Sequence, residues 1–217
     1  MDLLEQLQWR YAVKLFDGSN STSNEVIETL VAAAHLSPSA AGLQPYKLVL
    51  VQNRELLGRL AEHSMMNKDK INSADGLFVF AIYRQLSLET FSTHISQMIA
   101  QGLIPPVPES EVPIRYQRFM TRLPRDEDLQ AWAHKQAYLA LGALLTSCAI
   151  LGVDACPMEG FEAASYDELL GLAGQSLAGQ PLTSSVILAF GTRSPADPGQ
   201  HKKKYRRSRD QFLLHFP

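Results

Sequence analysis

The chain has 217 residues, of which 46% are hydrophobic and 19% are charged, and its formal net charge is −2. This is the balance of an ordinary globular protein, and the length is long for one domain and short for two, so we treat residues 1–217 as a single α/β or α+β domain. The opening MDLLEQLQWR lacks the pattern of a signal peptide, and the two cysteines, Cys148 and Cys156, lack metal-ligand spacing. We therefore expect a cytoplasmic protein with buried, reduced thiols.

Helical and extended patterns alternate in the first part of the chain. Asp2–Trp9 is amphipathic and predicts a helix, whereas Arg10–Phe16 alternates as an extended segment does. Thr22 and Glu25 form a capping-box pattern, which opens a helix that must stop by Pro38. A loop over Ser37–Pro45 and a strand over Tyr46–Gln52 are predicted next. Two helices over Asn53–His63 and Asn67–Asn72 and a buried strand over Leu77–Tyr83 follow.

The second part of the chain is richer in helices. A helix capped by Ser87 is predicted to run to about Gln101, and the proline-rich residues 102–113 are the candidate for a mobile loop or lid. Helices are then predicted over Ile114–Leu123 and Trp132–Gly152, and a strand over Val153–Met158. A helix opened by Ser165 and Glu168 and a strand over Ser184–Phe190 precede the basic tail. Helices outnumber strands, so we predict one sheet sandwiched between helices, with a mixed or a parallel strand order.

The segment Trp132–Gly152 is the longest and most apolar helical pattern. Ala137–Val153 carries no charge, but a bilayer-spanning helix needs about 20 apolar residues and this run is shorter and interrupted by small polar residues. We therefore predict a helix buried on all sides in a soluble protein. Small residues such as Gly142 would let another helix approach closely.

The common signatures of nucleotide binding and hydrolysis are absent. The sequence has no Walker loop and no GxGxxG, GxSxG or HExxH motif. Arg10 and Lys14 lie four residues apart in an extended segment, so both point to the same side. An arginine fork and a lysine point charge held together could bind an anion. A solvated edge with surface ion pairs is the alternative.

Three further stretches place polar groups beside loops. The glycine in Pro157–Phe161 would let backbone N–H groups approach a flat ligand, although many strands end in such a turn. Asn67 and Lys70 share one helix face, where they could address a heterocycle or simply be solvated. The basic run at residues 201–209 is either a flexible or nucleic-acid-binding arm or one side of a phosphate site.

Taken together, these stretches resemble the nitroreductase family of FMN-dependent NAD(P)H oxidoreductases, most closely its oxygen-insensitive, dihydropteridine-reductase-like branch. The resemblance runs from Arg10 to Arg209 and is carried by the order and spacing of RYAVKLF, HLSPSAAGLQPY, MNKDKINSA, WAHKQAYLALG, GVDACPMEGF and RSR. It implies a nitroreductase-like α+β fold with a central mixed or antiparallel sheet flanked by helices. It also implies an intertwined homodimer with two FMN sites at the subunit interface. The long apolar helix resembles the family's central dimer helix, and the tail over residues 193–217 would wrap onto the partner.

The resemblance also implies roles for individual residues. Arg10 resembles the arginine that grips the phosphate, and Lys14 the lysine beside the flavin's pyrimidine edge, where an ammonium favours the anionic reduced form. Glu159 and Gly160 resemble the pair whose backbone N–H groups face the flavin's N5 and O4. The implied cofactor contacts are Arg10, Tyr11, Ala12, Lys14, Ser37, Pro38, Ser39, Asn67, Lys70, Pro157, Met158, Glu159, Gly160, Arg207 and Arg209, of which Ser37, Pro38 and Ser39 would reach the flavin of the other subunit.

Two departures from the family pattern stand out. Ala12 occupies the place of a usual serine, so one hydroxyl contact is lost. Ala40–Gly42 and Tyr46 replace the polar residues before the Gln-Pro pair and the tryptophan after it, which alters the substrate contacts expected from this loop.

The reaction implied by the resemblance is ping-pong hydride transfer from NAD(P)H through FMN to a nitroaromatic, a quinone or a similar electron-poor acceptor. Ala41 and Phe119 are the implied contacts to this small-molecule acceptor. A solvent proton could serve, so no catalytic side chain is assigned, and no metal or membrane is implied. Two alternatives stay open. One is other flavin chemistry on the same fold, such as enone, pteridine or dehalogenation chemistry. The other is a non-enzymatic module that binds nucleic acid with the basic tail.

Overall fold

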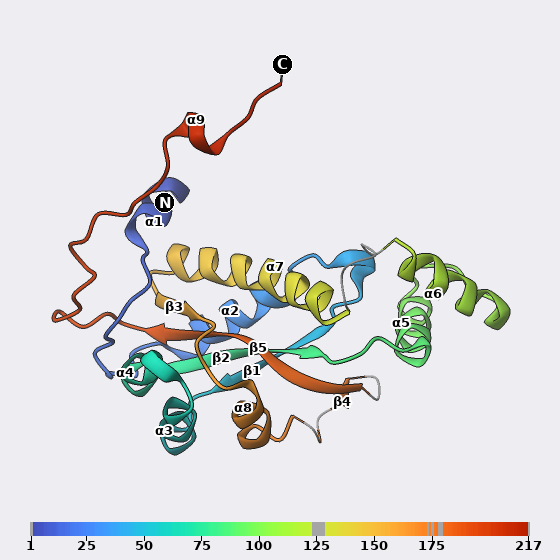
Figure 1. Cartoon of the computed structure of the whole chain (residues 1–217), viewed down its shortest axis with the longest axis horizontal. Coiled ribbons are helices and arrows are strands. Elements are labelled where there is room, and N and C mark those ends of the chain that lie inside the picture. Colours follow the sequence, from blue (N-terminus) through green and yellow to red (C-terminus); the bar gives the residue numbers. More distant parts are fainter. Residues whose placement is uncertain (1, 123–128, 173, 175, 178–179, 217) are drawn as a thin grey trace.

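An antiparallel sheet lies in the middle of the molecule (Figure 1). The computed structural model describes residues 2–122, 129–172, 174, 176–177 and 180–216. Along the sheet the strand order is β1 (Tyr46–Val51), β2 (Gly76–Tyr83), β5 (Gln180–Gly191) and β3 (Asp154–Met158), and the short β4 (Ser176–Leu177) pairs with β5. The α+β class is confirmed. The strands pair antiparallel, as the family resemblance allowed, and not in the mixed or parallel order that the chain pattern left open.

Helices flank the sheet and extend beyond its ends (Figure 1). They are α1 (Leu3–Trp9), α2 (Asn24–His35), α3 (Arg54–Glu62), α4 (Lys68–Ser73), α5 (Leu88–Ala100), α6 (Val112–Met120), α7 (Leu129–Ile150), α8 (Ala163–Leu169) and α9 (Arg209–Phe212), with 3-10 turns η1 (Ala40–Gly42), η2 (Met65–Asn67) and η3 (Glu109–Glu111). The predicted caps Asn53 and Ser87 are confirmed, because their side chains accept hydrogen bonds from the N–H groups of Leu56 and Thr90.

The sheet separates two apolar layers. All of β2 is buried, as its continuous apolar run predicts. Side chains alternate along the strand, so Phe78 and Phe80 pack with α2 and α7, whereas Leu77 and Val79 pack with α3, α4 and α8. This arrangement brings the carboxyl end of β3 and the middle of α7 to one side of the sheet.

Two predicted helix starts are wrong. Ser23, not Thr22, caps α2, since Ser23 accepts from the Val26 N–H while the Thr22 hydroxyl donates to Asp75. Similarly, α8 begins at Ala163, so Ser165 lies inside the helix rather than at its cap. Ser23 is one position after Thr22, and Glu162, directly before α8, makes no side-chain cap hydrogen bond.

Other boundaries also differ from the prediction. β5 begins at Gln180 rather than Ser184, and β4 was not predicted, because the residues concerned are polar and include Pro181. The proline-rich residues 102–113 contain η3 and the first turn of α6, where a proline is tolerated because its missing N–H would have no partner. The predicted end of that helix, Leu123, lies outside the described residues.

The long helix α7 is covered on one face only. Ala140 and Leu144 are buried against the sheet, whereas Leu139 is 51% exposed and Tyr138 39%. A side chain built at Gly142 would meet no atom within 4 Å. The expected burial on all sides is therefore not met within one chain. Within the described part of the chain, no helix combines the length and apolar character needed to cross a bilayer.

Candidate functional site

The extended segment after α1 is tied to the tail by one buried carboxylate. Asp197 is 2% exposed, and its Oδ2 accepts hydrogen bonds from the backbone N–H groups of Lys14 and Leu15, at 2.6 and 2.7 Å. Its Oδ1 accepts from the Tyr11 hydroxyl, at 2.9 Å, and from the Gly199 N–H, at 2.6 Å. Burial acts to raise the pKa of Asp197, but the hydrogen bonds hold it below its ordinary value of 3.8. The segment with the two predicted cations is thus held from the far end of the chain.

A second contact closes the two ends of the chain on each other. The Arg193 guanidinium lies 4.3 Å from the ring centre of Trp9 and 4.6 Å from that of Tyr11. Its Nε donates to the carboxylate of Asp154, at 2.8 Å from Oδ1, and its backbone N–H donates to the same group. Since Asp154 is the first residue of β3, the N-terminal segment, the tail and β3 form one packed unit.

Three cations converge beside β3. Ala12 forms a bridge with Ala155, so the segment from Arg10 to Lys14 runs along this strand. Burial raises the pKa of the Cys156 thiol in β3, and the positive charges of Lys14, Lys70 and Arg10 act on it in the opposite direction. Within the described residues, none of these cations has an ion pair with a carboxylate. A group of uncompensated cations on fixed backbone is suited to bind an anion.

The tail brings further basic groups to Arg10. Burial lowers the pKa of Arg10, and the charge of Arg206 lowers it further. Burial lowers the pKa of Lys204, and the charges of Arg10 and Arg206 lower it further. The Nζ of Lys204 donates to two carbonyls in the last turn of α1, at 2.6 and 2.7 Å. Arg207 and Arg209 are exposed on the arm that carries α9, which stands away from the sheet (Figure 1). Their predicted contact with the phosphate stays a prediction.

The loop after β3 is held by Asn67, the last residue of η2 before α4. The Asn67 amide donates to the Gly160 carbonyl, at 2.8 Å, and accepts from Lys70 Nζ, at 2.9 Å. A Cβ at residue 160 would lie 3.0 Å from Asn67 Nδ2, so the close approach favours glycine. On the other side, the Tyr138 hydroxyl of α7 donates to Glu159 Oε1. The structure therefore brings the pair Asn67 and Lys70 next to the stretch Pro157–Phe161, two features that were singled out separately from the sequence.

A cavity of about 540 Å³ lies between this loop and the open face of α7. Its volume is in the range of ligand sites, and its walls are mostly apolar. It is lined by Tyr138, Leu141, Gly142, Leu145, Pro157, Met158, Glu159 and Val186. Three predicted cofactor contacts thus face one cavity beside the group of cations.

The predicted contacts at residues 37–41 lie elsewhere in the chain. They sit by the N-terminal half of α7, where Gln136 Oε1 accepts from the Ala40 N–H at 2.8 Å. Ser37 is buried, Pro38 is exposed and Ser39 lies between these extremes. Arg10, by contrast, acts on the thiol of Cys148 near the C-terminal end of α7. Within one chain, residues 37–41 and Arg10 therefore lie near opposite ends of α7.

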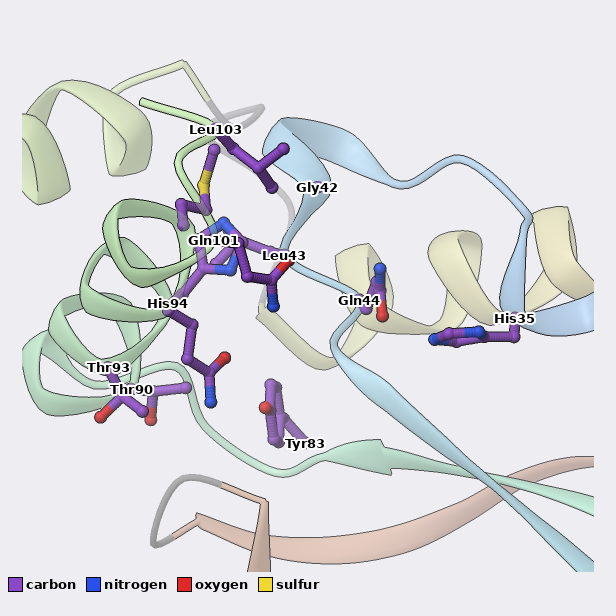
Figure 2. Close-up of a pocket in the computed structure, with 12 residues that line it drawn as sticks. His35, Gly42, Leu43, Gln44, Tyr83, Thr90, Thr93, His94, Gln101 and Leu103 are labelled. Carbon is purple, nitrogen blue, oxygen red and sulfur yellow. The ribbon is translucent and has the colours of Figure 1, made fainter. Parts of the chain in front are cut away.

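A second cavity, of about 490 Å³, adjoins that loop (Figure 2). Ala41 has a φ of 55°, a conformation that is uncommon for alanine, and its carbonyl lies 3.2 Å from His94 Nε2. Figure 2 shows the side chains of α5 on one side of the cavity and Gln44 and His35 on the other. The lining is a mixture of polar and apolar residues and consists of His35, Gly42, Leu43, Gln44, Tyr83, Thr90, Thr93, His94, Gln97, Met98, Gln101 and Leu103.

Phe119 packs in an aromatic group between α5, α6 and α7. Its ring centre lies 5.9 Å from that of Phe91 and 5.5 Å from that of Trp132. This group belongs to the same end of the molecule as the second cavity and not to the cations of the same chain (Figure 1). Its predicted contact with a substrate stays a prediction.

Several residues of this region were not singled out from the sequence. Tyr138 was read as part of an apolar run, and Asp197 and Arg193 as part of a basic tail. Tyr138 contacts Glu159, 21 residues away, Asp197 contacts Leu15, 182 residues away, and Arg193 contacts Asp154, 39 residues away. No local pattern in the sequence therefore marks these three residues. Among the described residues, no group of three His, Cys, Asp or Glu side chains could hold a metal ion.

The nitroreductase family model matches residues 7–191, which is most of the chain. The chain belongs to the nitroreductase family. This nitroreductase-family protein is 30% identical over 213 residues to a protein of Staphylococcus aureus strain USA300 that is provisionally named an NAD(P)H nitroreductase, with 97% of this chain and 94% of the relative covered.

Solved structures share the fold of this nitroreductase-family protein. A provisionally named nitroreductase of Exiguobacterium sibiricum, solved in complex with FMN, has a TM-score of 0.77 and 17% identity, over 100% of this chain and 98% of that one. An enone reductase of gut-bacterial fatty acid saturation has a TM-score of 0.74 and 17% identity, over 99% and 97%. The family and the fold predicted from the sequence are confirmed.

Proposed function

We propose that this protein is an FMN-dependent oxidoreductase that uses NAD(P)H to reduce nitroaromatics, quinones or similar electron-poor acceptors. The observation that carries the proposal is the grouping of Arg10, Lys14 and Lys70, which form no ion pair with a carboxylate of the described residues, beside the apolar cavity of about 540 Å³. The cations are suited to a phosphate and the apolar cavity to a flat ring system, so the residues present fit FMN. The Staphylococcus aureus relative and the FMN-bound structural neighbour support the same assignment.

The protein's own residues would bind and orient the cofactor. Arg10 would hold the phosphate, and Lys14 would place a positive charge beside the ring, where it favours the anionic reduced form. Pro157 would lie against the ring, and the N–H groups of Glu159 and Gly160 would face its N5 and O4 atoms. When bound, FMN supplies the hydride chemistry at N5. We also propose that two chains pair through the open face of α7, which would bring residues 37–41 of the partner toward this site.

The test of this function is spectroscopic. The purified protein, supplied with FMN, should be yellow, should bleach with NADH or NADPH and should regain its colour when a quinone is added. A colourless protein that takes up no FMN, and whose affinity for nucleic acid falls steeply with salt, would instead support a nucleic-acid-binding module.

Arg10→Ala should weaken FMN binding by about 1–3 kcal/mol, because a charge-assisted hydrogen bond to the phosphate is lost. The dissociation constant is measured by quenching of FMN fluorescence. Arg59→Ala is the matched control, since Arg59 is an exposed arginine of α3 far from β3 in the sequence and should leave FMN affinity unchanged. Equal affinity in the two variants would refute the phosphate assignment.

A second candidate is the reduction of enones by the same site, since one structural neighbour is an enone reductase. Comparing kcat/KM for a nitroaromatic, a quinone and a cyclic enone with one preparation of the FMN-loaded protein separates the two. Turnover of the enone alone would favour this candidate.

A further inference from the structure

Tyr138 and Glu159 form a pair at the mouth of the cavity between α7 and the loop after β3. The Tyr138 hydroxyl donates a hydrogen bond to Glu159 Oε1. Burial, and then the hydrogen bond to Glu159, raise the pKa of Tyr138, so the hydroxyl keeps its proton at neutral pH and remains the donor. The pair connects the open face of α7 to the loop proposed to face the cofactor.

Glu159 is the only carboxylate among the described residues that line this cavity. The remaining walls are mainly apolar, from residues such as Leu141, Met158 and Val186. Glu159 is exposed in one chain, so its charge would act more strongly than in water only on a ligand that excludes water from these walls. The position of this carboxylate therefore affects the electrostatics of whatever the cavity holds.

Two separate contacts fix the loop around Glu159. Tyr138 holds the side chain of Glu159 from α7, and Asn67 holds the carbonyl of Gly160 from the side of α4, at 2.8 Å. The second contact secures the backbone independently of the first. Loss of the Tyr138 hydroxyl would therefore free the Glu159 carboxylate while the loop stays in place.

We propose that Tyr138 is a positioning residue that holds the Glu159 carboxylate against α7 and so keeps its negative charge from turning toward the bound cofactor. This inference rests on the proposed function, because it requires FMN in the cavity. A released carboxylate would oppose the negative charge that the cofactor gains on reduction. The hydroxyl would thus adjust the reduction potential rather than take part in the reaction.

The experiment compares the FMN-loaded wild type with Tyr138→Phe, Glu159→Gln and the double variant. The midpoint potential of bound FMN is measured by equilibration with redox dyes, and FMN affinity by fluorescence quenching. Tyr138→Phe should disfavour reduction by about tenfold in the equilibrium constant, which is about 30 mV for a two-electron couple. Its FMN affinity should stay within about twofold, because the cations and Asn67 are untouched.

The double variant decides whether the carboxylate is responsible. In the Glu159→Gln background no charge remains to be released, so adding Tyr138→Phe should leave the potential unchanged. The same shift in both backgrounds, or an unshifted potential in Tyr138→Phe with FMN bound, would overturn the proposal while leaving the proposed function intact. A wild type that takes up no FMN would instead overturn the proposed function, and this inference with it.

Discussion

His94 is a half-buried histidine of α5 beside the loop in which Ala41 has a positive φ. Burial lowers the pKa of His94 below its ordinary 6.5, and the contact with the Ala41 carbonyl acts in the opposite direction. The unfolded chain therefore takes up a proton at this residue at a higher pH than the folded chain does. Stability that is complete above about pH 6.5 is lost as the pH falls toward the lowered folded value.

His94→Gln should reduce the loss of stability in acid, because glutamine does not titrate and can still donate to the Ala41 carbonyl. The free energy of unfolding in urea is measured at pH 7.5 and pH 5.5 for the wild type and the variant. Between pH 7.5 and pH 5.5 the free energy of unfolding should fall more in the wild type than in the variant. The other histidines, including His35 in the same cavity, contribute equally to both proteins. An equal loss in the two proteins would contradict the assignment.

The N-terminal extended segment and the tail depend on each other at the scale of whole elements. Asp197 accepts four hydrogen bonds, from the N–H groups of Lys14, Leu15 and Gly199 and from Tyr11. The two segments make the isolated bridges Ala12 with Ala155 and Phe16 with Arg193 rather than a ladder, so the bonds to Asp197 hold them in place. The geometry of the cation group follows from this contact between segments.

Asp197→Asn should destabilise the protein by about 3 kcal/mol, because an amide NH₂ would face backbone donors that the carboxylate now satisfies. It should also weaken FMN binding, since the segment from Arg10 to Lys14 would loosen. Urea unfolding and FMN titration measure the two effects. Asp210→Asn on the exposed α9 is the matched control. A variant as stable as the wild type would show that Asp197 does not hold the segment.

At the scale of the whole molecule, the open face of α7 is the largest departure from the expected burial. Leu139, Ile150 and Leu151 are 51%, 41% and 38% exposed, although they belong to the most apolar part of the sequence. Exposed apolar side chains on one helix, with Leu151 directly after its end, are typical of an interface. A second copy of the chain on this face would restore the predicted burial and complete the proposed site.

Gly142→Leu should leave the chain folded and prevent pairing, because the added side chain meets open space within one chain but would obstruct a close helix contact between two. Sedimentation equilibrium measures the assembly and circular dichroism the fold. Gly58→Leu on α3 is the matched control, since its position is equally open. A dimeric Gly142→Leu variant would place the interface elsewhere.

The parts of the fold that were predicted are those encoded locally. β1 and β2 follow from runs of apolar and β-branched residues, and β3 follows from the short, mostly apolar run Val153–Met158. The helices α3 and α5 follow from caps at their own first turns. The start of β5 was missed because the segment 180–183 includes a proline and two polar residues and is a strand through its pairing with β4 and β2. The antiparallel order of the sheet likewise depends on contacts between distant segments.

The same division applies to the candidate site. Arg10, Lys14, Asn67, Lys70 and Gly160 were singled out through the family resemblance, and the structure places them along β3 and the loop after it. Their contacts with FMN stay predictions. Asp197, Arg193 and Tyr138 were missed because each is defined by one partner that is distant in sequence. Hydrogen bonding of this kind leaves no periodic pattern.

The position of β5 between β2 and β3 has a consequence for synthesis in the cell. A ribosome delivers the chain from its N-terminus, so β1, β2 and β3 emerge before the strand that joins them. Until residues 180–191 are made, one edge of β2 has no partner to accept its backbone hydrogen bonds. The last tenth of the chain then fixes Tyr11 and Lys14 through Asp197. The nascent protein therefore completes the proposed anion-binding group only when translation is nearly finished.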